Sequence, residues 1–322
     1  MSKFIYILKR IGAMILTLLV IYVMSFVLIK MLPVEKPIGQ GNAARIEEAR
    51  REALGYNKPI LEQLVIYTRN IITKWDWGTS WRIDYMGDVG DVISSRLPPT
   101  ILINVYSLLF SIPVGVALGI FAAIKKNKWQ DQLISVMIML FISVPSYVYA
   151  FIVQYLLGFK AGWFPIVTSS LYDAGGTWFS WTMFHSMVLP VLSLSFGDIA
   201  GLARFTRAEL TEQLTSEYML LARTKGLTRS QATVRHALKN AMVPILPSII
   251  SMFVGVLGGS LIIEQIFGVP GIGALFLKSI NLKDYDVFMA TSMFYTVIGL
   301  AANILIDLSY GFLDPRIRMG ER

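Results

Sequence analysis

Six apolar runs of about 20 residues each constrain this chain more than any other feature. They cover residues 11–32, 100–124, 133–157, 187–205, 242–267 and 287–312. As a helix, each run is long enough to cross about 30 Å of hydrocarbon, and helices are required there because lipid offers backbone polar groups no partner. Only 16% of the 322 residues are charged, against about 25% in a soluble domain. The sequence therefore predicts an all-α integral membrane protein with six transmembrane helices.

The first run begins after a basic N-terminus and could be confused with a secretory signal peptide. It spans residues 11–32, which is too long for the apolar core of such a signal, and no small-residue cleavage site follows. We interpret it as a retained membrane helix. The chain contains no Cys, and its two histidines, His185 and His236, fall on opposite predicted sides of the membrane, so we expect no disulfide and no bound metal or cofactor.

The distribution of charge predicts the orientation of the six helices. With the N-terminus in the cytoplasm, the cytoplasmic pieces 1–10, 125–132, 204–240 and 313–322 hold 16 basic and 6 acidic residues. The outer pieces 33–99, 158–186 and 268–286 hold 12 of each. Because Lys and Arg favour the cytoplasmic side, both termini are expected to be cytoplasmic.

The segment between the first two spans, residues 33–99, is unusually long for a connection. Residues 43–54 are rich in Glu, Arg and Ala, residues 59–72 carry apolar side chains at helical spacing, and an aromatic turn follows at 75–81. We interpret the segment as a small folded extracytoplasmic cap, with a disordered insert as the alternative. The predicted organisation is a first helix at 1–32, the cap at 33–99, a five-helix core at 100–313 and a cytoplasmic tail at 314–322.

Four charged residues fall within the predicted spans or at their ends. Glu264 and Lys30 lie near outer ends, where their side chains can reach the interface. Asp198 and Asp307 lie in the cytoplasmic halves of their spans, with Arg204 and Arg207 after Asp198. Intramembrane charge suggests function by default. The midplane is almost uncharged, however, and we favour structural pairing near helix ends for both aspartates.

Small residues and prolines recur in the spans. Gly115 and Gly119, and then Gly255 and Gly259, are spaced for close approach of two helices. Prolines allow kinks because they free backbone carbonyls. They occur at Pro113, Pro145, Pro190, Pro244 and Pro247. Such features are common in membrane proteins and identify no single function.

The cytoplasmic loop 206–240 is the most informative part of the chain. Leu214, Tyr218, Leu221, Ala222 and Lys225 recur at spacings of three and four, which predicts one helical face. Gly226 follows as a helix stop, and a second helix at 229–240 leads into the fifth span. A helix, a glycine and a second helix form a lever joined to two spans, which is typical of a docking element. An amphipathic helix lying on anionic lipid is the alternative.

The sequence contains none of several motifs that carry chemistry. There is no nucleophile elbow, no His-Glu-x-x-His zinc motif and no P-loop. The chain is therefore not expected to be an enzyme or to hold ATP itself. If transport is driven by ATP, a separate polypeptide must hydrolyse it.

The loop resembles the coupling motif of permease subunits of ABC importers, in the oligopeptide and dipeptide branch. Gly226 matches the motif glycine, whereas Leu220, Leu221 and Ala222 stand where the motif has Glu-Ala-Ala, so only the last alanine is kept. Similarity to the branch extends over nearly the whole chain. It includes the stretches 54–59, 77–80, 96–100, 236–244, 264–273 and 313–318. Residues 32–37 depart from the Pro-Gly-Asp-Pro-like turn usual in this branch.

The resemblance implies the type I ABC importer permease fold in a bacterial cytoplasmic membrane, with the cap as an insert. It also implies four kinds of partner: the lipid bilayer, a homologous second permease, two P-loop ATPase subunits that bind ATP and Mg²⁺, and an extracytoplasmic peptide-binding protein. No nucleic acid is expected. In this arrangement Tyr218, Leu221 and Ala222 fit a groove of an ATPase subunit. The full set expected to couple is Glu217, Tyr218, Leu221, Ala222, Arg223, Thr224, Lys225 and Gly226.

A broad, weakly charged path would suit varied peptides. The core spans offer polar or small residues for its lining: Asn104, Ser107, Gln154, Ser251, Gly255, Gly259 and Ser260. The same machinery could instead carry dipeptides, nickel chelates, opines or haem, because the binding protein largely selects the cargo. A secondary transporter is expected to have ionisable residues at the midplane or inverted repeats, and the sequence shows neither. An intramembrane enzyme requires a nucleophile or a set of metal ligands, which the sequence also lacks.

Overall fold

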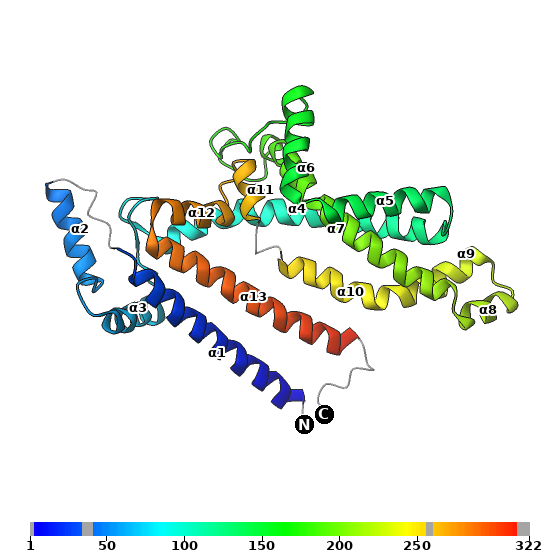
Figure 1. The fold of residues 1–322 in the computed structure, drawn as a ribbon, viewed down its shortest axis with the longest axis horizontal. Coiled ribbons are helices and arrows are strands. Elements are labelled where there is room, and N and C mark those ends of the chain that lie inside the picture. The colour runs from blue at the N-terminus through cyan, green and yellow to red at the C-terminus, as the bar shows by residue number, and fades with distance from the viewer. Residues whose placement is uncertain (1–2, 34–40, 256–259, 314–322) are drawn as a thin grey trace.

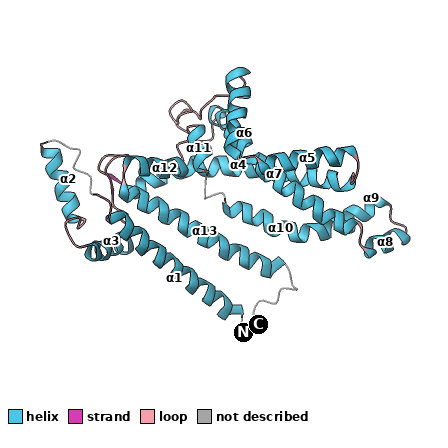
Figure 2. Ribbon diagram, in the orientation of Figure 1, coloured by secondary structure: helices cyan, strands magenta, loops and turns pink. Residues whose placement is uncertain are grey.

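The computed structural model describes residues 3–33, 41–255 and 260–313, and side chains within 8–33, 41–253 and 260–305. Helices make up most of this part of the chain, as Figure 2 shows. Two short strands, β1 (Thr79–Ser80) and β2 (Gly87–Asp88), pair antiparallel, with Thr79 opposite Asp88 and Ser80 opposite Gly87.

Among the described residues, four helices are long and apolar enough to cross a membrane. They are α1 (Lys3–Lys30), α4 (Val89–Ile124), α7 (Trp181–Leu214) and α13 (Tyr285–Leu313). Each contains one of the apolar runs expected to span. α4 and α7 extend well beyond those runs, which makes them 36 and 34 residues long.

The run at 133–157 is not one straight helix. α5 (Trp129–Ser143) ends before Pro145, and α6 (Ser146–Val153) continues into the π-helical turn η1 (Gln154–Lys160) at an angle of 105° to α5. The residue before a proline avoids the helical region, and Val144 is accordingly extended, with φ −91° and ψ 127°. Pro145 therefore breaks the expected span, and α5 with α6 and η1 forms at most one bent crossing.

The run at 242–267 is also interrupted. α10 (Leu238–Gly255) is followed by α11 (Leu261–Ile266), and residues 256–259 between them lie outside the described part of the chain. α12 (Ile272–Leu282) then leads to α13. Four spanning helices, or five with the bent pair, are counted among the described residues, so the total of six stays a prediction.

The longest interface in the fold joins α4 to α7, and glycines of α4 make it close. A Cβ on Gly119 would lie 2.6 Å from Cβ of Thr206 and 2.7 Å from the carbonyl oxygen of Ala203, both on α7. A Cβ on Gly115 would lie 3.1 Å from the carbonyl oxygen of Ile199. The expectation that Gly115 and Gly119 allow close helix approach is therefore confirmed.

Residues 41–88, which we call the cap segment, fold against α1 and α13. The segment contains α2 (Asn42–Ala53), α3 (Ile60–Lys74) and the two strands. Tyr67 of α3 is buried with Phe26 and Ile29 of α1 and with Met289 and Met293 of α13. The helices expected at 43–54 and 59–72 are thus present, and a shared apolar cluster holds them.

Figure 1 shows how the parts lie relative to one another. α1 and α13 run side by side, and the cap helices α2 and α3 lie at one end of the molecule. The short helices α8 (Glu217–Thr224) and α9 (Arg229–Ala232) lie at the opposite end. The long helices therefore separate the cap segment from the loop at 215–237.

Candidate functional site

The loop expected to couple folds as a hairpin of short helices, which we call the coupling hairpin (residues 215–237). It runs from α8 through α9 to the π-helical turn η2 (Thr233–Ala237), which continues directly into α10. Thr228 caps α9: its hydroxyl accepts from the Gln231 N–H at 3.2 Å, and its own N–H donates to the Gln231 side chain at 3.1 Å. The two ends of the hairpin therefore join α7 and α10 with little loose chain.

Gly226 ends α8 in the way the sequence predicts. Its φ is +95°, and its N–H donates to the Arg223 carbonyl at 3.0 Å, while the N–H of Leu227 donates to the Ala222 carbonyl at 3.3 Å. This pair of hydrogen bonds is the Schellman motif, in which the residue after the helix adopts a left-handed conformation. No atom lies within 4 Å of a Cβ built on Gly226, so conformation and not space selects glycine here.

The base of the hairpin packs on the ends of three long helices. Met219 and Ala222 of α8 are buried with Ala123 of α4, Leu210 of α7 and Ala241 of α10. Ala232 and Ala237 complete the same cluster. A shift of α8 would therefore reach α4, α7 and α10 through this shared cluster of buried side chains.

The single face expected for this helix is wrong in detail. Leu221 is 55% exposed, whereas the neighbouring Ala222 is 8% exposed and faces the cluster within this chain. Tyr218 is half-buried, and its hydroxyl donates to the Gln213 side chain at 2.6 Å. Adjacent helical residues point about 100° apart, so Leu221 and Ala222 lie at opposite edges of the expected face, and packing buries only Ala222. The surface left open comprises Glu217, Leu220, Leu221, Arg223, Thr224 and Lys225.

A cavity of about 420 Å³ lies between α4, α6 and α7 near the start of α11. Its lining is mostly polar or small: Asn104, Ser107, Leu108, Ser146, Tyr149, Leu194, Gly197, Asp198, Met252 and Ser260. Such a volume falls in the range of about 300–1,000 Å³ that is usual for small-molecule sites. The cavity is therefore a candidate segment of a path through the core.

The residues expected to line a path separate into three groups. Asn104, Ser107 and Ser260 line this cavity together, although the Ser107 hydroxyl also hydrogen-bonds Ser195 at 3.0 Å. Gln154 and Ser251 satisfy backbone carbonyls, those of Ile166 and Ile266 and that of Pro247 respectively. Gly255 ends the described stretch of α10, and Gly259 lies outside the described residues.

Glu264 and Lys30, the two charged residues expected near the outer ends of their spans, contact other residues of the chain. Glu264 is fully buried, and its carboxylate accepts from the Thr100 hydroxyl at 2.9 Å and the Ala274 N–H at 3.0 Å. Lys30 lies 3.7 Å from the Asp286 carboxylate and 3.8 Å from the centre of the Tyr56 ring. Both side chains therefore find partners within the chain, and their position relative to a membrane interface stays a prediction.

In the structure, Asp198 does not pair with Arg204 or Arg207, the two arginines that follow it in sequence. Arg207 binds both carboxylate oxygens of Asp131, at 2.5 and 2.8 Å, and Arg204 is exposed. Within the described part of the chain, no hydrogen bond or ion pair joins Asp198 to another residue. The side chain of Asp307 lies outside the described residues.

Two carboxylates that sequence reasoning missed anchor the cap segment. Asp284 accepts hydrogen bonds from Ser80 Oγ at 2.6 Å and from the backbone N–H groups of Trp81, Arg82 and Ile83. Asp286 accepts from the Tyr56 hydroxyl at 2.7 Å and the Thr79 N–H at 3.2 Å. Their only sequence signal was two acidic residues immediately before the last apolar run.

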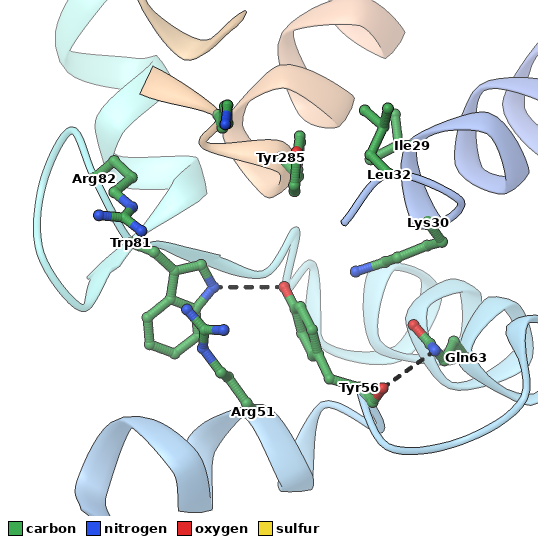
Figure 3. A pocket seen from close by; sticks show the side chains of 10 residues that line it. Ile29, Lys30, Leu32, Arg51, Tyr56, Gln63, Trp81, Arg82 and Tyr285 are labelled. Carbon is green, nitrogen blue, oxygen red and sulfur yellow. Dashed lines mark hydrogen bonds between the residues drawn. The ribbon is translucent and has the colours of Figure 1, made fainter. Parts of the chain in front are cut away.

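Figure 3 shows the small pocket that adjoins this anchor. Trp81 Nε1 donates to the Tyr56 hydroxyl at 3.4 Å, and Lys30 reaches toward the same ring. The pocket volume is about 40 Å³, far below the range of about 300–1,000 Å³ that is usual for small-molecule sites. It is therefore a structural feature of the cap and too small for a peptide.

Comparison with known proteins places these features in a family. Residues 115–319 match the family described as "Binding-protein-dependent transport system inner membrane component". The chain is 35% identical over 315 residues to a dipeptide transport system permease protein of Lactococcus lactis, covering 98% of this chain and 99% of the relative. It is 34% identical over 327 residues to a protein of the same name in Bacillus subtilis, with the same coverage.

A glutathione transport system permease protein of Escherichia coli is 31% identical over 316 residues, covering 97% of this chain and 98% of the relative. The matched family segment holds the coupling hairpin, the close contacts of Gly115 and Gly119 with α7, and the part of the cavity lining that comes from α6, α7 and later residues. The chain therefore belongs to the family of binding-protein-dependent transport system inner membrane components, the membrane permeases of ABC transporters.

Proposed function

We propose that this chain is one of two permease subunits of an ATP-driven importer of short peptides. The relatives named for dipeptide and glutathione transport support this cargo class. A homologous permease would complete the path, and an extracytoplasmic binding protein would deliver the peptide. Two P-loop ATPase subunits would bind ATP and Mg²⁺, so that this chain holds no cofactor and performs no hydrolysis.

The observation that carries the proposal is the position of α8. Its inner side is packed on α4, α7 and α10 through Met219 and Ala222, while Leu221, Arg223 and Lys225 remain exposed. Large exposed apolar side chains next to cations suit a groove with acidic groups at its edge. ATP-driven closure of the two ATPase subunits would move α8, and the shared cluster would pass the motion to the long helices, opening the path outward. This is alternating access by a shift of population between two states.

Replacing Leu221 with Asp tests the docking role directly. The side chain is exposed in this chain, so Leu221→Asp leaves the packing of the permease intact but puts a charge in the proposed contact with the ATPase. The control is Leu61→Asp, which makes the same change at an exposed position of α3 at the opposite end of the molecule. We expect Leu221→Asp to abolish peptide uptake and lower co-purification of the ATPase subunits at least about tenfold. Normal uptake and normal assembly in Leu221→Asp would refute the coupling role of α8.

A further inference from the structure

Asp198 is the single carboxylate among the described residues that line the core cavity. It lies on α7, and no Lys or Arg belongs to the described lining. Asn104, Ser146, Tyr149 and Ser260 place amide and hydroxyl groups around the same space. The cavity therefore combines one negative charge with several neutral polar groups.

The charge of Asp198 is not neutralised within the described part of the chain. The arginines that follow Asp198 in sequence form no ion pair with it, since Arg207 binds Asp131 and Arg204 is exposed. A carboxylate in a membrane-spanning segment is costly unless it is paired or faces a water-filled path. Its position in a polar cavity indicates a group whose counter-charge arrives from outside the chain.

A primary ammonium group fits this surrounding better than a metal ion does. An ammonium group donates three hydrogen bonds and has no need of a full shell of oxygen ligands. A divalent cation would take several carboxylate ligands, and no group of three or more metal-ligating side chains occurs among the residues the structure describes. Hydroxyl and amide oxygens next to one carboxylate can accept all three donors of an ammonium group.

We propose that Asp198 binds the α-ammonium group of the transported peptide inside the core cavity. The inference rests on the proposed peptide-import function and names the group of the cargo that this chain recognises. Every unmodified peptide carries an α-ammonium group, whatever its side chains are. One carboxylate can therefore orient all cargoes alike, while the neutral remainder of the lining accepts different side chains.

The test uses the assembled transporter in proteoliposomes with its binding protein and ATP. One cargo is dialanine, and the other is its analogue in which a hydroxyl replaces the α-amino group. Both are supplied at concentrations that fill the binding protein equally, as determined by titration. We expect the wild-type complex to take up dialanine at least about tenfold faster than the analogue, since a hydrogen bond to a charged group is lost with the amine.

Variants of Asp198 distinguish recognition of the α-ammonium group from a structural role of this side chain. Asp198→Asn and Asp198→Ser remove the charge, and both are expected to bring the uptake ratio of dialanine to its analogue close to one. Asp198→Glu keeps the charge and is expected to keep the preference. Asp91→Asn makes the same chemical change at an exposed position of α4 and is the matched control. Co-purification of the partner subunits verifies assembly of every variant.

The possible results have distinct meanings. A merely structural role for Asp198 would lower uptake of both cargoes equally, and an unchanged ratio in the two neutral variants would overturn the inference. A third cargo, the hydroxyl analogue with lysine at its second position, carries only a side-chain ammonium group, and full uptake of that compound would overturn the assignment to the α-ammonium group. If the wild-type complex imports no peptide at all, the proposed function itself fails, and the inference fails with it.

Discussion

The hydroxyl of Thr100 donates to the carboxylate of Glu264 at 2.9 Å, although 164 residues separate the two. The same hydroxyl oxygen accepts from the Ile272 N–H at 2.9 Å. Thr100 lies on α4, Glu264 on α11 and Ile272 at the start of α12, so one buried hydroxyl connects three helices. This arrangement explains why a glutamate can be fully buried here, since its oxygens are occupied by donors.

Replacing Thr100 with Val should show how much the hydroxyl of Thr100 contributes to the stability of the fold. The valine keeps the shape but offers Glu264 and Ile272 no hydrogen-bonding group, which should destabilise the fold by about 1–3 kcal/mol. Thr100→Ser retains the hydroxyl and is the matched control. Thermal unfolding of the purified complex in detergent provides the measurement. Equal midpoint temperatures for Thr100→Val and Thr100→Ser would contradict the role of the hydroxyl.

Replacing Gly119 with Leu should separate α4 from α7. Even a Cβ at this position meets Thr206 and Ala203 at less than 3 Å, so a leucine requires the helices to move apart, with a cost of about 1–3 kcal/mol or more. Gly12→Leu on α1 is the control, because no atom lies within 4 Å of a Cβ there. Thermal midpoints and yields of assembled complex should fall only for Gly119→Leu. A midpoint and yield of Gly119→Leu equal to those of Gly12→Leu and the wild type would mean that the close α4–α7 contact is not required.

Replacing Gly226 with Val should misplace α8 without affecting membrane insertion. The left-handed conformation costs a β-branched residue roughly 1–2 kcal/mol, so the Schellman closure should weaken. Asn tolerates this conformation, which makes Gly226→Asn the control. We expect uptake of peptide per ATP hydrolysed to fall in Gly226→Val and to stay near wild type in Gly226→Asn. Normal coupling in Gly226→Val would count against the need for this backbone geometry.

Replacing Tyr56 with Phe should weaken the anchor of the cap segment. Burial, followed by the neighbouring Asp286 carboxylate, raises the pKa of the Tyr56 hydroxyl well above its usual value. The hydroxyl therefore donates to a charged acceptor at neutral pH, and its loss should cost about 1.5–3 kcal/mol. Tyr172→Phe, at an exposed site in the 161–180 loop, is the control. An unchanged unfolding midpoint in Tyr56→Phe would show that the hydrogen bond to Asp286 contributes little.

The same pKa shift predicts a pH dependence with a definite sign. Because the folded protein holds the Tyr56 proton more tightly, the resulting stability is complete below the unfolded pKa of about 10 and is lost as the pH rises toward the folded value. Above about pH 10, the thermal midpoint of the wild type should therefore fall more steeply than that of Tyr56→Phe. The difference between the two profiles measures the contribution of the Tyr56 hydroxyl, and parallel profiles would contradict it.

Reporter fusions should determine the orientation of the chain. The cap segment and the coupling hairpin lie at opposite ends of the molecule (Figure 1), and basic residues concentrate in the loop that contains the hairpin. A reporter fused after Arg82 should be active outside the cytoplasm, and one fused after Gly226 should be active inside. The reverse pattern would exclude docking of a cytoplasmic ATPase on α8.

The sequence by itself determined the features that depend on short stretches of chain. Apolar length predicts the long helices and Gly226 predicts the end of α8, because each depends on hydropathy or backbone conformation within a few residues. The small residues of α4 belong to the same class, since Gly115 and Gly119 are spaced along one helix face. Pro145 predicts only a kink within one span, whereas the structure shows a break with an angle of 105°.

Only the tertiary structure decided which distant groups meet. A glutamate near a helix end, such as Glu264, can point toward the membrane interface or into the protein. It points into the protein because Thr100 and Ala274 donate hydrogen bonds to its carboxylate. The division of α8 between Leu221 outside and Ala222 inside depends on where α4, α7 and α10 end, which no local pattern states. Asp198 was expected to pair near a helix end, but Arg207, the arginine nine residues after it, binds Asp131 instead. Partner choice depends on packing between residues that are 76 positions apart for Asp131 and Arg207 and 164 apart for Thr100 and Glu264. Helix length and termination are local, and this difference separates what sequence predicts from what folding decides.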